Sequence, residues 1–549
     1  MPNTRRHTTT HRRGRIHPHQ RDADFTGPLL GDNIDLPETY VSNVQATEDF
    51  KIDVKTKRTH RNRIKQFYSF LETEFPSYYE IGVRELSEDE LADQTKYFWK
   101  NKHDLVYSGL NPKFLKAFLS TKVKKENGKT MSYDNIRKYF DAIQYGATEA
   151  ECLLPVSFYQ EKDKFLQAFR KQVAKAKGSG DIEEQEADPI PFGLYVLICT
   201  WGVKFGNVML WVWSVFQWNL LARSVNVEPL SFRNFKVFED NIQVKYDKNK
   251  SDQGGENTTV KHIYANPTNP FICPFLSMGI YLCLNATRYV ETPFIFRRSD
   301  DEKEKVASAN YCCQLKELIN KKIEVVTSYI RMAHANAHGW RKGGATHATS
   351  GTTCPPSLSS VARRGEWSMG RVLDVYWHCA EPGDQYLGRV IAGLNALKAS
   401  FKILPPHFKD ENALENPLVH EAMNLMYGPI LSRWAETDQD PTSVLLRFLA
   451  SCIYHFEWIQ QIASSSTDHP FNAIPLLFNA DLVEELKSLV TTEPSQVISE
   501  ATGIPPHVEH SSMLQCLLEM AHETLQILKR QVVDVKQVSY VETQFLFYF

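Results

Sequence analysis

The sequence lacks any apolar run long enough to cross a bilayer. The strongest such run, Val208–Ala222, is too short and carries Gln217 and Asn219, so we expect a buried core helix and no membrane partner. The ten cysteines never occur with C-x-x-C spacing, and no secretory leader opens the chain. These absences predict reduced thiols in an intracellular compartment rather than a disulfide framework.

A strong net charge is also missing, but the charges are unevenly distributed. The formal net charge is −2 over 549 residues, which does not by itself indicate a nucleic-acid-binding protein. The first 22 residues nevertheless hold six Arg and four His with almost nothing apolar, which predicts a disordered basic arm and a weak nuclear localisation signal. Lys and Arg stay abundant to about Lys177, while acidic residues gather in GDIEEQEAD and in the last third. A positively charged half is compatible with DNA binding.

Hydrophobic residues make up 42% of the chain, enough to build several cores, and they recur mostly at helical spacing. We predict a mainly α fold with a small β-sheet and find no internal repeat. The predicted organisation, by residue number, is a basic arm over 1–48, a helical domain over 49–177, a linker over 178–190, a helical domain with a small sheet over 191–400, and a helical C-terminal extension over 401–549.

Several elements of the second half can be placed individually. Two apolar helices, Phe192–Lys204 and Val208–Arg223, come first. The segment Phe235–Pro267 then alternates with period two around a Gly-rich turn, as a β-hairpin does. The remaining predicted helices are one that opens at His338 and stops at Gly351, a short one over 354–365 with Pro at an early position, one over 369–380, and an amphipathic final helix that can bind a partner helix.

The motif HGWRKGG places His338 and Arg341 three residues apart, on one face of the helix that it opens. Both polar groups can therefore reach the same ligand. Arginine suits a phosphodiester because its planar guanidinium donates two parallel hydrogen bonds to the free oxygens. Arg223, at the end of the apolar run, is either a paired structural ion or a second phosphate ligand.

Other residues add the remaining roles of phosphoryl chemistry. Lys250, near the Gly-rich turn, is a candidate general acid for a leaving 5′ oxygen, with Lys248 as its adjacent competitor. Trp367 precedes Tyr376 by nine positions, and a tyrosine can attack phosphorus as a covalent nucleophile. Each of these residues is common in ordinary cores and surfaces. The prediction of a site for phosphoryl chemistry therefore depends on their order along the chain.

That order of Arg, hairpin Lys, His-x-x-Arg, Trp and Tyr resembles the tyrosine recombinases, the integrase family that cuts DNA through a phosphotyrosine. The amino-acid sequence of residues 248–282 and 338–394 is most similar to the recombinases of Crypton-type DNA transposons of eukaryotes. On this sequence the family's catalytic set falls on Arg223, Lys250, His338, Arg341, Trp367 and Tyr376.

The resemblance implies a core-binding domain over 49–177, a tyrosine recombinase catalytic domain over 191–400, and an oligomerisation or regulatory role for 401–549. It implies cleavage and rejoining of double-stranded DNA through a 3′-phosphotyrosyl intermediate, as the site-specific recombinase or transposase of a Crypton-like element. No metal or cofactor is implied. Such an enzyme acts in the nucleus as a homo-oligomer, dimer to tetramer, on DNA.

Two positions depart from the family's pattern. Asn226 stands where an acidic residue often follows the first arginine, and Glu366 stands where glycine commonly precedes the late His or Trp. Glu366 is expected to bring a carboxylate close to the scissile phosphate. The alternative function is therefore a domesticated DNA-binding protein that keeps the fold with little or no cleavage.

Two further alternatives stay open. One is a type IB topoisomerase, which uses similar chemistry without paired sites. For either enzyme, Tyr386 competes with Tyr376 as the nucleophile. A metal enzyme is the third class, although no zinc spacing is met. It would draw on the histidines and cysteines in and after the motif: His334, His338, His347, Cys354, His378 and Cys379.

Overall fold

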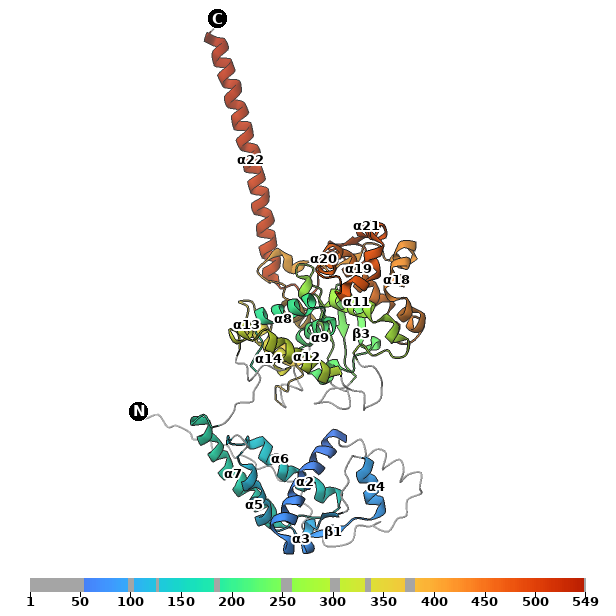
Figure 1. Cartoon of the computed structure of the whole chain (residues 1–549). Coiled ribbons are helices and arrows are strands. Elements are labelled where there is room, and N and C mark those ends of the chain that lie inside the picture. The colour runs from blue at the N-terminus through green and yellow to red at the C-terminus, as the bar shows by residue number, and fades with distance from the viewer. Residues whose placement is uncertain are drawn as a thin grey trace, which may run out of the picture. The chain divides into compact units, whose positions relative to one another are not determined.

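The computed structural model describes residues 54–96, 103–124, 128–181, 188–247, 259–296, 307–330, 337–370 and 381–547. The chain divides into two compact units, Met1–Glu184 and Gln185–Phe549, which we term the N-terminal and C-terminal units (Figure 1). Several predictions lie outside the described residues: those on the arm over 1–48, Lys248, Lys250, His334, residues 371–380 of a predicted helix, Tyr376, His378 and Cys379.

Helices dominate the described part of the N-terminal unit. α2 packs along α6, and its Phe67 and Leu71 share one core with Phe140 and Ile143 of α6. The elements are α2 (Val54–Glu74), α3 (Pro76–Gly82), β1 (Val83–Glu85), α4 (Glu88–Lys96), β2 (His103–Leu105), α5 (Pro112–Lys122), α6 (Tyr133–Glu149) and α7 (Val156–Gly178).

The sequence pattern missed the antiparallel pairing of β1 with β2, in which Val83 lies opposite Leu105. Each strand has three residues, which is too short for an alternating hydrophobic pattern to be recognised. The short helix α3, just before β1, was missed as well, whereas the mainly helical character of the region was predicted. At α5, for example, Asn111 accepts the backbone N–H of Lys113 at 3.0 Å and Pro112 opens the helix, so the N-terminal signal is local.

The C-terminal unit is also mainly helical, with small antiparallel sheets of order β3-β4-β5 and β6-β7. This confirms the predicted class, mainly α with a small β-sheet. The elements are α8 (Phe192–Lys204), α9 (Val208–Asn219), α10 (Ser224–Val227), β3 (Phe235–Phe238), β4 (Asn241–Val244), β5 (Lys261–Ile263), α11 (Pro274–Leu284), α12 (Ala307–Lys321), α13 (Ile323–Thr327), α14 (His338–Ser350), α15 (Leu358–Arg364), α17 (Glu381–Ile391), β6 (His407–Phe408), α18 (Pro417–Trp434), α19 (Thr442–Tyr454), α20 (Phe456–Ala463), α21 (Ala480–Leu489), β7 (Val490–Thr491) and α22 (Pro506–Phe547).

The apolar run that begins at Val208 forms α9, which lies in the middle of the C-terminal unit (Figure 1). Its side chains are buried on every face, as expected of a core helix. The helix ends at Asn219 and not at Arg223. Leu221 takes a left-handed conformation with φ 47°, and the N–H of Ala222 returns to the carbonyl of Gln217 at 3.0 Å, which closes the helix.

Two expected helix boundaries after the HGWRKGG motif can also be compared with the structure. Gly351 caps the C-terminus of α14, as predicted. The prolines of CPPSLSS, however, precede α15 and do not lie in its first turn. Ser357 is the N-cap residue, and its hydroxyl accepts the N–H of Ser360 at 3.1 Å, so the side-chain cap decides where this helix begins.

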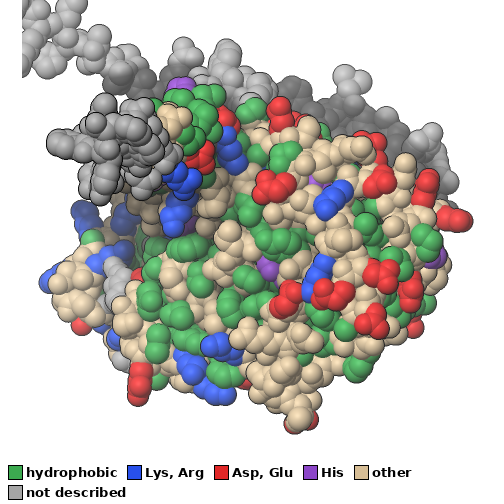
Figure 2. All heavy atoms as spheres, turned by 90° about the horizontal axis from the view of Figure 1, so that it is seen from above, with side chains coloured by type: hydrophobic (Ala, Val, Ile, Leu, Met, Phe, Trp, Pro, Cys, Tyr) green, Lys and Arg blue, Asp and Glu red, His purple; other side chains and the backbone are tan. Residues whose placement is uncertain are grey.

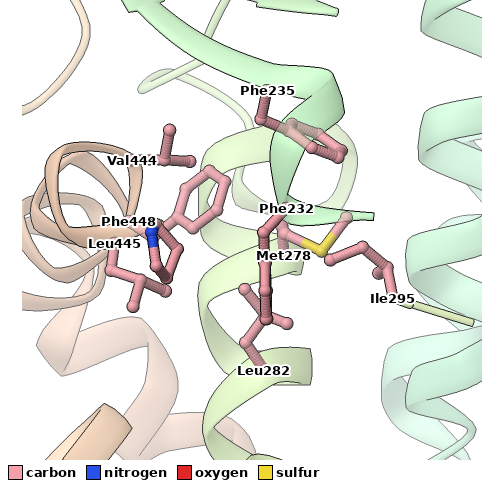
Figure 3. A pocket seen from close by; sticks show the side chains of 9 residues that line it. Phe232, Phe235, Met278, Leu282, Ile295, Val444, Leu445 and Phe448 are labelled. Carbon is pink, nitrogen blue, oxygen red and sulfur yellow. The ribbon is translucent and has the colours of Figure 1, made fainter. Parts of the chain in front are cut away.

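One hydrophobic core runs from Ile190 to Leu486 and crosses the predicted boundary at residue 400. Helices α18, α19 and α21 pack into it together with α9 and α11. Where α19 meets α11 and β3, an apolar cavity of about 10 Å³ lies among Met278, Phe235 and Phe448 (Figure 3). A space of this size is at most that of one water, so it is a packing defect and not a ligand site.

The surface seen from the side where α22 leaves carries both basic and acidic side chains among its described residues (Figure 2). Seen from this end, Lys and Arg side chains lie mostly on one side of the face, and Asp and Glu side chains are scattered over the rest among apolar and neutral ones (Figure 2). Within the described residues, no helix combines the length and apolarity that a membrane span requires.

His455, between α19 and α20, makes the stability of the C-terminal unit depend on pH. It is 5% exposed, and burial lowers its pKa from 6.5 to about 4. The folded state therefore binds fewer protons than the unfolded state in this window. Stability is complete above pH 6.5 and falls as the pH drops toward 4. We expect His455→Gln to remove about 2 kcal/mol of the stability difference between pH 7.5 and pH 4.5.

Urea unfolding of the wild type and of His455→Gln at both pH values measures this difference. If both proteins lost the same unfolding free energy between pH 7.5 and pH 4.5, the His455 imidazole would not be the cause of the pH dependence.

Candidate functional site

Helix α14 approaches its neighbours closely at two glycines of the HGWRKGG motif. A Cβ at Gly343 would lie 2.0 Å from the carbonyl oxygen of Ile190. A Cβ at Gly344 would lie 2.5 Å from Leu221 Cδ2, at the end of α9. At Gly343 only glycine permits the approach, because the neighbouring atom belongs to the backbone, whereas at Gly344 the Leu221 side chain would have to shift. The two approaches bring Arg341 beside the turn that follows α9.

Replacing Gly343 by Ala is expected to destabilise the C-terminal unit by about 2 kcal/mol or more, because the Ile190 backbone must move to admit the methyl group. Gly178→Ala at the end of α7 is the control, since a Cβ there meets nothing within 4 Å. The control should be neutral or stabilising by up to about 1 kcal/mol. Chemical denaturation followed by circular dichroism compares the two variants. Equal denaturation midpoints would contradict the close packing of Gly343 against the Ile190 backbone.

Arg341 is held by backbone carbonyls and by an indole ring. Its side chain donates to the carbonyl of Leu221 at 3.2 Å and to that of Gly365. The guanidinium carbon lies 4.9 Å from the centroid of the Trp367 ring. Arg341 is 6% exposed, and no described carboxylate forms an ion pair with it. The cation is therefore fixed between the ends of α9 and α15. The carboxylate charge of Glu366, which is itself paired with Lys261, acts on Arg341 only through space and opposes the effect of burial.

Arg223 is the N-cap residue of α10 and follows the left-handed turn at Leu221. Its Nη1 is buried and has no hydrogen-bond partner among the described residues. A buried N–H that donates to nothing costs free energy, so this atom fits a site that an anion completes.

Gln217, which is 1% exposed, links the two arginine-bearing segments. Its Nε2 donates to the carbonyl of Ala337, just before α14, at 2.9 Å and to the hydroxyl of Ser224 at 3.2 Å. The residue that precedes His338 and the residue that follows Arg223 are thus tied to one amide. The sequence signal is a polar residue inside an apolar run, which by itself indicates only that the run does not span a membrane.

The two guanidinium groups are close enough for their charges to interact. Burial, together with the positive charge of Arg223, lowers the pKa of Arg341 to about 10. Two like charges held in a partly dry site repel each other until an anion binds between them. The arrangement therefore favours a ligand with a negative charge that is spread over more than one oxygen.

The turn after α15 holds Trp367 against Arg341. Glu366 adopts a left-handed conformation with φ 53°, and the N–H of Trp367 returns to the carbonyl of Ala362 at 2.9 Å. This is a helix-closing turn in which glycine is free of strain, whereas a residue with a Cβ costs about 1 kcal/mol. It also aims the carbonyl of Gly365 at Arg341.

The carboxylate of Glu366 is paired inside the protein. Lys261 Nζ donates to Oε1 at 2.8 Å and Asn226 Nδ2 donates to Oε2 at 3.1 Å. The side chains of Lys261 and Glu366 are 1% and 4% exposed. The two positions that depart from the family's pattern, 226 and 366, therefore contact each other. Glu366 does not present a bare carboxylate to a phosphate, as the sequence alone had suggested, because Lys261 neutralises it.

A second buried network joins α15 to α17. Arg364 donates to both oxygens of Asp384, at 2.8 and 2.7 Å, and the backbone N–H of His262 donates to the same carboxylate at 2.8 Å. Burial alone would raise the pKa of Asp384, but the Arg364 charge and these hydrogen bonds hold it well below its usual range. The network fixes the chain on both sides of residues 371–380, within which Tyr376 lies.

The structure brings three members of the predicted set together: Arg223, Arg341 and Trp367. His338 is exposed in the first turn of α14, one turn before Arg341. Lys250 and Tyr376 lie outside the described residues. The sequence did not single out Lys261, because a lysine in a predicted hairpin is expected at the surface, whereas every residue of β5 is buried.

Tyr386, the competing nucleophile, has a structural role. Its hydroxyl donates to the carbonyl of Cys354 at 2.5 Å, and burial raises its pKa to about 12. Among the described residues, no group of three or more His, Cys, Asp or Glu side chains is placed to bind a metal ion. His347 instead stacks on Phe192, with ring centroids 4.4 Å apart.

Comparison with models of protein families gives no match, and neither does comparison with curated proteins.

Proposed function

We propose that the protein cleaves and rejoins double-stranded DNA through a 3′-phosphotyrosyl intermediate, as the site-specific recombinase of a Crypton-like mobile element. The observation that carries the proposal is the pair Arg223 and Arg341. They are adjacent cations with no described carboxylate partner, and one of them has a buried N–H that donates to nothing described. A phosphodiester supplies what the pair lacks, one negative charge on two free oxygens.

In the proposed reaction the phenol oxygen of Tyr376 attacks the scissile phosphorus. The bond from phosphorus to the 5′ oxygen breaks, which leaves a 3′-phosphotyrosyl link and a 5′-hydroxyl. Lys250, or its competitor Lys248, gives a proton to the leaving 5′ oxygen. The phenol proton goes to His338 or to water, and in the second case His338 donates a hydrogen bond to the phosphate.

The two arginines bind the non-bridging oxygens and stabilise the charge that builds up on them in the transition state. Trp367 packs on Arg341 and keeps its guanidinium plane in place. The ester energy stays in the phosphotyrosine, so attack by a second 5′-hydroxyl reverses the step without an added energy source. Attack by the 5′-hydroxyl of another strand gives recombination, which we propose takes place in the nucleus on sites paired by a homo-oligomer.

The alternative is a DNA-binding protein that keeps this fold without cutting. It was motivated by the carboxylate of Glu366, which would repel a phosphate. The ion pair with Lys261 removes most of that objection because the pair is neutral as a whole.

The proposal is tested by trapping a covalent adduct. The full chain is incubated, with EDTA present, with a pool of nicked duplexes of randomised sequence, and protein–DNA links that survive SDS are sequenced. We expect a 3′ link to protein and a free 5′-hydroxyl. DNA binding without any adduct would support the non-cutting alternative, and relaxation of supercoiled plasmid without site preference would support a topoisomerase.

A further inference from the structure

Helix α22 leaves the C-terminal unit after a short anchored stretch. Val508 is 2% exposed and packs with Val390 and Phe401, and Lys402 forms an ion pair with Glu509. From 513 to 532 every side chain is exposed. Figure 1 shows the helix standing out from the rest of this unit. Beyond its first turns, α22 therefore has no partner among the described residues of the chain.

One face of this free helix carries a continuous apolar stripe. Its large side chains are about half or more exposed, from 48% at Leu525 to 70% at Leu518. The spacing alternates between four and three residues, which is the repeat of a two-stranded coiled coil, in which such side chains interlock. The stripe consists of Leu514, Leu518, Ala521, Leu525, Leu528 and Val532.

The opposite face is polar, so the helix is amphipathic and not apolar all round. Cys516, Glu519, Glu523, Gln526 and Arg530 lie there. A shorter row of Met513, Leu517, Met520 and Ile527 widens the apolar side. An exposed apolar face of this length marks an interaction surface.

We propose that this stripe packs against the same stripe of a second copy of the chain, with the two α22 helices parallel. The flanking residues favour that occupant and that direction. In a parallel pair, Leu517 faces the partner's His522 and Thr524 faces the partner's Lys529, so no like charges meet.

The area is also sufficient for a stable dimer. Six stripe side chains on each of two helices, at about 100 Å² each, bury on the order of 1,200 Å², which is the lower end of the range for specific interfaces. The first turns of α22 are anchored to the rest of the C-terminal unit. Pairing of two α22 helices therefore places two C-terminal units side by side. The inference does not depend on the proposed chemistry, because the helices pair without DNA.

The test compares oligomeric states of the full chain without DNA. Light scattering on the wild type at micromolar concentration should give about twice the chain mass of 63.1 kDa. The double variant Leu518→Glu with Leu525→Glu places charges in the stripe and should give the monomer mass, with the dimer dissociation constant raised at least about 100-fold. Because Leu518 and Leu525 are exposed in a single chain, the unfolding midpoint of the C-terminal unit should stay unchanged in this variant.

The matched control is Cys516→Glu with Gln526→Glu, which adds the same charge to the opposite face of the same helix and should remain dimeric. A wild type that stays monomeric, or a stripe variant with the same mass as the control, would overturn the proposal and leave the stripe for a different protein. For the direction, oxidised Leu528→Cys should give a disulfide-linked dimer that the wild type does not give. Failure of that link in an intact dimer would overturn the parallel arrangement.

Discussion

Replacing Tyr376 by Phe is expected to abolish the covalent protein–DNA adduct, with a loss of at least about 10⁴-fold in cleavage. The phenol oxygen is the atom that bonds to phosphorus in the proposed reaction, and phenylalanine has no nucleophile to take its place. DNA affinity should change little, because phosphate contacts from Lys and Arg dominate binding. Adduct yield on the trapped nicked duplex and the dissociation constant of the same duplex are the two measurements.

Tyr386→Phe is the matched control, since it also removes one phenol hydroxyl close to the same segment. The hydroxyl of Tyr386 is bound to the carbonyl of Cys354, so its removal should leave the adduct and cost only some stability. If Tyr376→Phe still formed the adduct and Tyr386→Phe did not, the nucleophile would be Tyr386. That result would leave the arginine pair as the phosphate site.

Arg341→Lys is expected to lower the cleavage rate by on the order of 100- to 1,000-fold, although the charge is conserved. A lysine ammonium cannot donate to Leu221, Gly365 and a phosphate in one plane, and it is a poor replacement beneath the Trp367 ring. Single-turnover cleavage at saturating protein measures the loss in the chemical step separately from DNA binding.

Arg433→Lys is the control for this change, because Arg433 of α18 also lies over an indole ring, that of Trp434, but is itself exposed. It should cleave at the wild-type rate. A circular dichroism melt of Arg341→Lys shows whether the buried hydrogen bonds it loses also affect folding. Near-normal cleavage by a folded Arg341→Lys protein would exclude the proposed role of this guanidinium.

The arginine pair could be anticipated because its signals are local. The His-x-x-Arg spacing places two side chains on one helix face, and Arg223 follows the most apolar run of the chain. The exact turn that holds Arg223 was not predictable, since Leu221 adopts a conformation that its side chain disfavours. Packing of the fully buried Leu221 and the hydrogen bonds around it decide that turn.

In the C-terminal third, tertiary packing decided more than the local sequence could predict. Its helices were visible as amphipathic patterns, yet nothing in the local sequence indicates that α18, α19 and α21 share one core with α9 and α11. A hydrophobic face indicates that something will cover it and does not indicate what. The same limit applies to α22, whose partner we infer from the heptad spacing of its exposed stripe and from its flanking charges.

By itself the sequence determined the mainly helical class, the central apolar helix and the spacing of the motif around His338, because each depends on residues within a few turns of one another. Only the tertiary structure decided that Glu366 is neutralised. Its partners, Lys261 and Asn226, lie 105 and 140 positions away along the chain. The sign of the field at a phosphate site depends on distances in space, and separation along a polymer does not report those distances.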